Sequence, residues 1–184
     1  MTPMLAYRFS GEDVAGWLLS EKFDGVRCIL SGGKLWSRNG NEFRAPAWWM
    51  HNLPSGVVLD GELWIARGTG RRMAGVARRK TPVDAQWEQV RLLVFDAPEA
   101  RCGFAERQKT VKESVYGFSG CRMIEQIPCL GRDHLEQMLD DVARIGGEGV
   151  VARRADSPYV YDRSMDFLKY KPRYRMSCRV PVFQ

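Results

Sequence analysis

One short run of this sequence combines a lysine, an acid, a glycine and an arginine in a spacing suited to nucleophilic chemistry. The run, residues 21–27, reads EKFDGVR and places Lys22 two positions before Asp24. A lysine amine has an ordinary pKa near ~10.4, so it attacks an electrophile at neutral pH only where cations, a metal or burial lower that pKa. The same pattern also occurs in solvated turns at strand ends. This run alone therefore leaves both interpretations open.

Five further short motifs follow in order along the chain. They are SRNG at 37–40, LDGELW at 59–64, VFDAP at 94–98, EGVVAR at 148–153 and FLKYKP at 167–172. Together with the Lys22 run they resemble the motifs of the covalent nucleotidyltransferases, the superfamily of polynucleotide ligases and mRNA capping enzymes. SRNG and LDGELW look most like the adenylation domain of small ATP-dependent DNA ligases of bacteria and viruses, especially the ligase E type. Six motifs in the right order rarely arise by chance.

Alternating, β-branched runs flank the motifs, whereas helical periodicity is confined to a few segments. Strands are expected at 17–21, 26–30, 35–36, 57–64, 90–95, 148–153 and 167–171, with a Gly-Gly turn at 32–33. Helices are expected at 45–52, 84–88, 104–116 and 133–145. Strands outnumber helices without regular alternation, which indicates an α+β fold with largely antiparallel sheets. The resemblance implies an ATP-grasp-like nucleotidyltransferase domain of two packed sheets with a nucleotide cleft between them and flanking helices.

The length of 184 residues and the hydrophobic content of 45% fit one domain with a sizeable core. We expect the adenylation domain to span residues 1–172, leaving a short tail over 173–184 where such ligases normally begin an oligonucleotide-binding (OB) fold. This tail is too short for a five-stranded barrel. The sequence thus predicts no OB-fold in this chain. Three alternatives are open: an excised catalytic domain, a natural minimal enzyme, or a separate polypeptide that supplies the OB-fold or another DNA-binding partner.

The resemblance implies that ATP is the cofactor and that Lys22 becomes covalently attached to AMP, with Asp24 as a further catalytic residue beside it. Lys169 and Lys171 would contact the α-phosphate; because they lie two positions apart, a strand would present both on one side. A solvated strand face is the alternative for this pair. The other implied nucleotide contacts are Glu21, Arg27, Arg38, Glu62 at the ribose and Phe95 against adenine. An aromatic residue on an apolar strand is otherwise usually part of a core.

A metal ion is also implied, with Glu148 as its ligand. Hard carboxylate and phosphate oxygens suit Mg²⁺, for which Mn²⁺ can substitute. Asp60 either helps to place this metal or caps a turn, and the sequence does not decide between the two.

The charge of the chain favours a polyanionic partner. Its net charge is +6 and its pI is near 9.2. Residues 67–80 carry six basic side chains and no acidic one, interleaved with glycines, which predicts a loop that cannot pack into a core and that can contact phosphates. We expect Arg71, Arg72, Arg78 and Arg79 to contact the DNA backbone, although a merely solvated loop is the alternative. The resemblance implies that Arg38 reads the 5′-phosphate at a nick.

The location expected for this protein is the cytoplasm. No apolar run approaches the length of a membrane span, and residues 1–5 lack a basic region followed by an apolar one. This departs from the ligase E type, which usually carries a secretion signal. The five cysteines include no closely spaced pair, so we expect them to be reduced.

The function predicted is that of a monomeric ATP-dependent DNA ligase acting on nicked double-stranded DNA. Lys22 would take AMP from ATP and pass it to the 5′-phosphate, after which the 3′-hydroxyl would displace AMP. An RNA ligase or a capping-type transferase would share the lysine and metal chemistry. A non-catalytic nick-binding module would keep the basic segment but would not need all six motifs.

Overall fold

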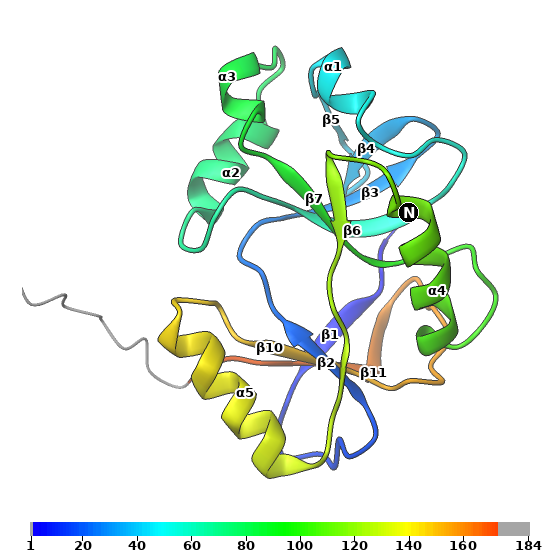
Figure 1. Ribbon diagram of the computed structural model, residues 1–184, viewed down its shortest axis with the longest axis vertical. Helices are drawn as coiled ribbons and strands as arrows, with labels where there is room; N and C mark the ends of the chain where they lie inside the picture. The colour runs from blue at the N-terminus through cyan, green and yellow to red at the C-terminus, as the bar shows by residue number, and fades with distance from the viewer. Residues whose placement is uncertain (1, 173–184) are drawn as a thin grey trace, which may run out of the picture.

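The computed structural model describes residues 2–172 and contains two β-sheets with helices around them (Figure 1). The six-stranded sheet has the order β5 (Glu42–Phe43), β4 (Lys34–Ser37), β3 (Val26–Ser31), β6 (Leu59–Trp64), β7 (Arg91–Asp96), β8 (Cys121–Met123). The five-stranded sheet has the order β1 (Leu5–Arg8), β11 (Arg163–Tyr170), β10 (Val150–Arg153), β2 (Leu18–Glu21), β9 (Ile127–Pro128). Only the β1–β11 and β7–β8 pairings among these are parallel. The expected α+β fold with two largely antiparallel sheets is confirmed.

The six-stranded sheet carries the larger core, because four helices pack against it or its connections. They are α1 (Ala47–Met50), α2 (Gly70–Ala77), α3 (Asp84–Trp87) and α4 (Phe104–Val115). Apolar residues of β3, β6 and β7 join those of the helices in one buried cluster, in which Trp49 and Trp87 meet edge to face at 4.8 Å. Gly32 and Gly33 both have positive φ and form the turn between β3 and β4, as their sequence predicted.

The five-stranded sheet has a smaller core, which is covered by α5 (Arg132–Arg144). Leu135, Leu139 and Val142 recur at helical spacing and are the buried face of this helix. Gly146, with a φ of +78°, follows the last turn and ends the helix. The helix thus packs on one face of the sheet that contains β2 and β10.

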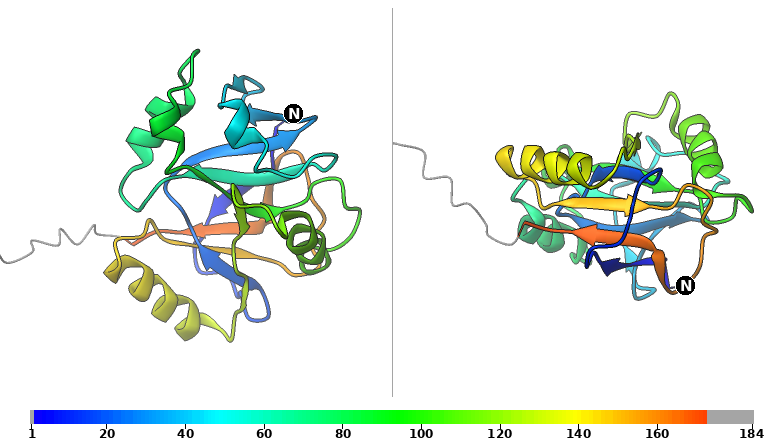
Figure 2. Two further views of the ribbon diagram at one scale, coloured as in Figure 1. Left: turned by 45° about the horizontal axis from the view of Figure 1, so that its top comes forward. Right: turned by 90° about the horizontal axis from the view of Figure 1, so that it is seen from below.

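The two sheets lie one above the other, and the chain passes between them several times (Figures 1 and 2). The segment between β2 and β3, residues 22–25, is one of these crossings, and it contains Lys22. Gly25 is needed at its end because a Cβ there would collide with the carbonyl oxygen of Leu63 on β6. The fold therefore places the candidate nucleophile, Lys22, in a connection between the two sheets.

A buried group of charges joins the sheets on the side of α4. Asp96, at the end of β7, accepts hydrogen bonds from Arg107 of α4 at 2.6 Å and from Arg153 of β10 at 2.8 Å. All three side chains are almost completely buried. Arg153 is also held between the rings of Phe104 and Phe167, each 4.7 Å from its guanidinium carbon. One carboxylate thus connects a strand of each sheet.

The prediction of a loop over residues 67–80 is wrong, because α2 occupies residues 70–77. Met73, Val76 and Ala77 are buried at helical spacing, while Arg71 and Arg72 face outward. The arginines and glycines concealed this short apolar stripe in the sequence. The basic residues therefore sit on a packed helix and at its end, not on a free loop.

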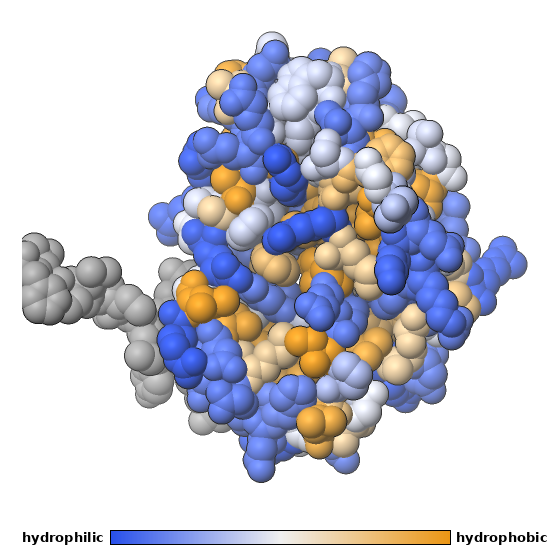
Figure 3. Space-filling view, viewed as in Figure 1, coloured by the Kyte–Doolittle hydropathy of each residue, from blue (hydrophilic) through white to orange (hydrophobic). Residues whose placement is uncertain are grey.

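The surface seen in Figure 3 is mostly hydrophilic, and hydrophobic side chains gather between its upper and lower halves. Within residues 2–172 the helices are too short or too polar to cross a membrane. The expected tail over residues 173–184, with its basic residues Arg173, Arg175 and Arg179, lies outside the described part of the chain.

Candidate active site

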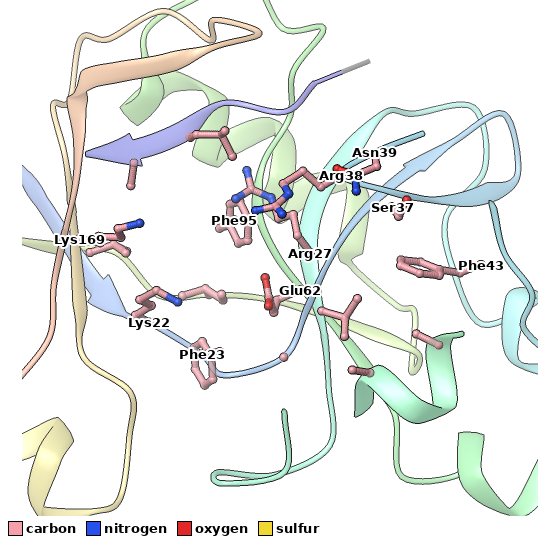
Figure 4. A pocket seen from close by; sticks show the side chains of 18 of the residues that line it. Lys22, Phe23, Arg27, Ser37, Arg38, Asn39, Phe43, Glu62, Phe95 and Lys169 are labelled. Atoms are coloured by element: carbon pink, nitrogen blue, oxygen red, sulfur yellow. The ribbon is translucent and has the colours of Figure 1, made fainter. Parts of the chain in front are cut away.

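A cavity of about 750 Å³ opens between the two sheets and is lined by residues from both (Figure 4). The cavity collects nine of the residues singled out in the sequence: Glu21, Lys22, Arg27, Arg38, Glu62, Arg78, Arg79, Phe95 and Lys169. In the close-up, Lys22 and Lys169 lie on one side, facing Arg27, Glu62 and Phe95 on the other. Segments separated by more than a hundred residues in the sequence therefore meet around one cavity.

Lys22 is held by Glu148 at the edge of this cavity. Its amine lies 2.6 Å from one carboxylate oxygen of Glu148, and the amine of Lys171 lies 2.5 Å from the other. The backbone supports this arrangement, since the amide of Lys22 donates to the carbonyl of Gly149 at 2.8 Å. Gly149 has positive φ, and a Cβ there would collide with the carbonyl oxygen of Tyr170. The glycine after Glu148 thus allows three strands to approach closely.

The electrostatics of the carboxylate follow from this pairing. Burial alone would raise the pKa of Glu148, but its hydrogen bonds to Lys171 and Lys22 hold that pKa below its usual value. The side chain of Glu148 is 16% exposed, so solvent can still reach it. Glu148 is therefore an ionised carboxylate paired with two lysines, one of which, Lys22, borders the cavity.

Lys169 and Lys171 do not share the position that their spacing predicted. Lys171 pairs with Glu148 just beyond β11, whereas Lys169 points into the cavity without a hydrogen-bond partner among the described residues. Burial, together with the neighbouring cations Arg163, Lys22 and Lys171, lowers the pKa of Lys169. An anion in the cavity would meet an unpaired cation here.

Glu62 lies opposite these lysines on β6, and its carboxylate makes no hydrogen bond within residues 2–172. Burial raises its pKa to about 7, although Arg27 and Lys22 act in the opposite direction. Gly25 packs directly against its side chain. Glu62 is thus a recessed acid with its hydrogen-bonding capacity still open to a ligand.

Arg27 and Phe95 form a flat surface in the wall of the cavity. The guanidinium carbon of Arg27 lies 4.5 Å from the centroid of the Phe95 ring. Asp60 holds the guanidinium from behind, at 2.5 Å from Nε and 2.6 Å from Nη2. Phe95 is partly exposed to the cavity, not buried in the core.

Asp60 is engaged by neighbouring side chains and does not border the cavity. It is completely buried, and its oxygens accept hydrogen bonds from Arg27 and Tyr159. These hydrogen bonds occupy the carboxylate, so Asp60 is neither a free metal ligand nor a turn cap. The expectation that Asp60 helps to place the metal is therefore not kept. Within residues 2–172 no three His, Cys, Asp or Glu side chains come together as a ready-made metal site. Glu148 is then the acid left for a metal, and Mg²⁺ commonly takes one or two carboxylates together with substrate phosphates.

Glu21 and Asp24 flank Lys22, and both face the segment that leads into α2. Arg67 donates to the two carboxylate oxygens of Glu21 at 2.9 and 2.7 Å. The carboxylate of Asp24 lies against Gly70, the first residue of α2, where a Cβ would collide with it. A negative charge at a helix N-terminus is favourable. Glu21 also borders the cavity, whereas Asp24 does not.

The basic residues expected to contact DNA divide into two groups. Arg38, Arg78 and Arg79 border the cavity, and their side chains reach solvent. Arg71 and Arg72 lie on the outer face of α2, where Arg72 donates to Gln89 at 3.1 Å. The cavity thus opens toward a basic surface at the end of α2.

Three residues were missed by reasoning from the sequence: Arg153, which borders the cavity, and Arg107 and Tyr159 behind it. Arg153 closes the EGVVAR motif, but arginine at a strand end is ordinarily solvated. Its Nε atom is buried without a hydrogen-bond partner among the described residues. Asp96 follows Phe95 on β7, and the alternation of a strand, which puts them on opposite faces, was the one available signal for a buried acid.

Comparison with known proteins agrees with these motifs. Residues 3–171 match the family model described as the ATP dependent DNA ligase domain. Over 179 residues the chain is 34% identical to a DNA ligase of Haemophilus influenzae, covering 96% of this chain and 66% of that protein. It is 30% identical to the bifunctional non-homologous end joining protein LigD of Bacillus subtilis, of which it spans 31%.

Solved structures extend the comparison to the fold. A structure from a study of DNA binding by Lig E DNA ligases superposes with a TM-score of 0.85 at 32% identity, covering 94% of this chain and 69% of that one. The Chlorella virus DNA ligase-adenylate superposes with a TM-score of 0.74 at 20% identity, covering 94% and 68%, and shows the same fold. The family match, the relatives and the fold agree: this chain belongs to the family of ATP-dependent DNA ligase domains.

Proposed function

We propose that residues 1–172 are the adenylation domain of an ATP-dependent DNA ligase that seals nicks in double-stranded DNA. Lys22 is the nucleophile in this proposal. The observation that carries it is the meeting of the Lys22 amine, Lys169 and the recessed Glu62 around one cavity large enough for a nucleotide. Drug-sized ligands commonly occupy cavities of ~300–1,000 Å³.

In the first step, the Lys22 amine attacks the α-phosphorus of ATP. A nitrogen–phosphorus bond forms, the bond to the bridging oxygen breaks, pyrophosphate leaves, and the amine gives up a proton. Lys169 would stabilise the charge that develops on the α-phosphate, and the base would pack against Phe95 and Arg27; the position of Lys169 in the cavity and the stacking of Arg27 over Phe95 support these roles. Glu62 accepts hydrogen bonds from the ribose hydroxyls.

The metal in this proposal is Mg²⁺, or Mn²⁺ in its place. Glu148 would hold it together with phosphate oxygens, and the ion would supply charge neutralisation for the leaving pyrophosphate. Glu148 is paired with Lys22 and Lys171, so it would give up these ion pairs if it held the metal.

In the later steps AMP passes from Lys22 to the 5′-phosphate of the nick, and the 3′-hydroxyl then displaces it. Arg38 would contact the 5′-phosphate, and the arginines on and after α2 would contact the flanking backbone. The position of these arginines beside the mouth of the cavity and on the outer face of α2 supports this assignment.

The test is to incubate the protein with ATP labelled at the α-phosphate and with Mg²⁺, and to follow acid-stable label on the protein. We expect labelling, and transfer of the label to nicked DNA on its addition. Nicked RNA and α-labelled GTP serve as comparisons, because transfer to RNA would indicate an RNA ligase and GTP labelling a capping-type enzyme. Absence of label with every nucleotide would contradict the proposal.

A further inference from the structure

Four residues from separate parts of the chain form a closed ring of hydrogen bonds behind the cavity. The Tyr159 hydroxyl donates to Asp60 Oδ2 at 2.6 Å, and the Met4 amide donates to the Tyr159 oxygen at 3.1 Å. Arg27 Nη2 completes the ring by donating to Asp60 Oδ2 at 2.6 Å and to the Met4 carbonyl at 3.1 Å. Met4 precedes β1, Arg27 and Asp60 lie on β3 and β6, and Tyr159 lies between β10 and β11.

The ring fixes the one side chain among its members that reaches the cavity. Asp60 and Met4 are completely buried, whereas the Arg27 side chain is 18% exposed and borders the cavity. The hydrogen bonds of the ring use Nη2 of Arg27. A further hydrogen bond, to Asp60 Oδ1, uses its Nε atom. Its Nη1 atom makes no hydrogen bond within residues 2–172 and is the nitrogen available to a ligand. The guanidinium is thereby held over Phe95 with both N–H groups of Nη1 free.

Tyr159 is the ring member best placed to adjust this geometry. Asp60 Oδ2 receives hydrogen bonds from both the Tyr159 hydroxyl and Arg27 Nη2, so the hydroxyl fixes the direction in which the carboxylate faces the guanidinium. Without it, the carboxylate could rotate and the Met4 amide would lose its acceptor. Both changes would weaken the hydrogen bonds from Arg27 to Asp60 and to the Met4 carbonyl, which hold its guanidinium in place.

We propose that Tyr159 is a positioning residue that acts through Asp60 and Arg27 to set the affinity of the cavity for ATP. This inference rests on the proposed function, because it takes ATP as the ligand of the cavity. It assigns to Tyr159 no contact with the nucleotide. The hydroxyl lies behind Arg27 and is bonded to an acid that solvent does not reach.

The test measures the dissociation constant for ATP by calorimetry, without divalent metal so that no lysyl-AMP forms. Tyr159→Phe removes only the hydroxyl oxygen and should weaken ATP binding about five- to tenfold, within the range expected for the loss of one ordinary hydrogen bond. Tyr161→Phe is the matched control, because Tyr161 contacts the Tyr159 ring edge to face but is 44% exposed. The control should bind ATP as the unchanged protein does.

A double-mutant cycle separates positioning from a general loss of structure. Arg27→Lys keeps a cation but lacks the two-nitrogen fork that Asp60 holds. In that background, Tyr159→Phe should weaken ATP binding less than about twofold further, because its effect passes through the fork. Independent, multiplying effects of the two substitutions would overturn the proposal. So would an equal loss of affinity in Tyr161→Phe.

The outcomes also distinguish this inference from the proposed function. If the unchanged protein binds no ATP, the nucleotide site itself is wrong. If it binds ATP and Tyr159→Phe binds equally tightly, only the positioning role is wrong. Thermal melting of each variant accompanies the titrations, and a loss of ATP affinity counts for the proposal only where the variant melts cooperatively above the titration temperature. An unfolded Tyr159→Phe counts against it, since the hydroxyl would then be needed for folding.

Discussion

Lys22 is the residue on which the proposed chemistry depends, and its replacement is the most direct test. We expect both Lys22→Ala and Lys22→Arg to abolish acid-stable labelling by ATP, because alanine has no amine and a guanidinium stays protonated at any accessible pH. Lys109→Ala, which removes an exposed lysine of α4, is the control and should label normally. Label retained in either Lys22 variant would remove this residue from its role.

Glu148 is expected to be as necessary as Lys22, for a different reason. Glu148→Ala removes the acid proposed to hold the metal, and metal stabilisation of a phosphoryl transition state contributes several kcal/mol, so labelling should fall at least ~100-fold. Glu106→Ala removes an exposed acid from α4 and should leave the rate unchanged. An undiminished rate of the Glu148 variant in Mg²⁺ would contradict the assignment.

Glu62 makes a prediction about pH. Because burial raises its pKa to about 7 in the folded protein, the folded state holds a proton that the unfolded state releases near its ordinary pKa of 4.5. The contribution of protonated Glu62 to the free energy of unfolding is thus fully present below pH ~4.5 and is lost as the pH rises through 7. Urea unfolding should show Glu62→Gln gaining ~1–3 kcal/mol relative to the unchanged protein between pH ~4.5 and ~8. A constant difference would show that Glu62 stays ionised.

At this scale, the sequence predicted which residues gather but not how each is paired. The cavity brings together four residues of the motifs, because each motif lies on or beside a strand that borders it: Lys22, Glu62, Phe95 and Lys169. The environment of Asp60 could not be predicted, since its partner Tyr159 lies 99 positions away in a segment without a periodic pattern. The roles of these residues remain predictions.

Helix α2 illustrates the corresponding limit for elements. Longer segments were predicted well: the helix expected at 133–145 is α5 at Arg132–Arg144, because its apolar residues repeat at helical spacing over several turns. In α2 only eight residues are helical, and two of them are glycines, which have low helix propensity. Packing of Met73 and Val76 on the six-stranded sheet stabilises a helix that local preference does not favour.

The basic residues of α2 and the turn after it should serve DNA binding without serving attack on ATP. Neutralising Arg71, Arg72, Arg78 and Arg79 together should leave labelling by ATP nearly intact and weaken binding to nicked duplex. Removing one phosphate contact lowers the slope of log affinity against log salt by ~0.9, so the slope should flatten by about 3 to 4 units.

The control for this experiment removes the same charge elsewhere. Neutralising Lys109 and Lys112 of α4 with Arg132 and Arg144 of α5 changes the net charge equally on helices away from the cavity mouth. Its salt slope should stay near that of the unchanged protein. If both quadruple variants flatten the slope alike, net charge and not a DNA surface on α2 explains the binding.

The molecule as a whole has to hold two sheets at a fixed separation, because the proposed site draws its lysines from one and its nucleotide surface from the other. The cavity between them is open to solvent, so apolar packing between the sheets is interrupted there. The buried charges of Asp96, Arg107 and Arg153 join β7, α4 and β10, and Arg153 also borders the cavity. This group is one buried polar link between the two sheets.

Removal of Asp96 should therefore be costly out of proportion to one side chain. Asp96→Ala leaves two buried guanidinium groups without their anion, and breaking a buried ion pair in this way typically costs about 3–5 kcal/mol. Burial lowers the pKa of Arg153, and Arg107 beside it does the same, whereas Asp96 acts to raise it. Without Asp96, Arg153 would still be buried away from water and would still be repelled by the positive charge of Arg107. Urea unfolding at neutral pH measures the loss, with Asp141→Ala, which breaks an exposed pair with Arg144, as a control expected to lose less than ~1 kcal/mol.

The same variant tests whether the link between the sheets matters for the site. Phe95 precedes Asp96 on β7, and Val151 near the lysines shares β10 with Arg153. If the charges set the separation of the sheets, Asp96→Ala should weaken ATP binding at temperatures where it remains folded, while Asp141→Ala should not. A variant that is destabilised by the expected amount but binds ATP normally would show that the apolar contacts, not the buried charges, hold the cavity in shape.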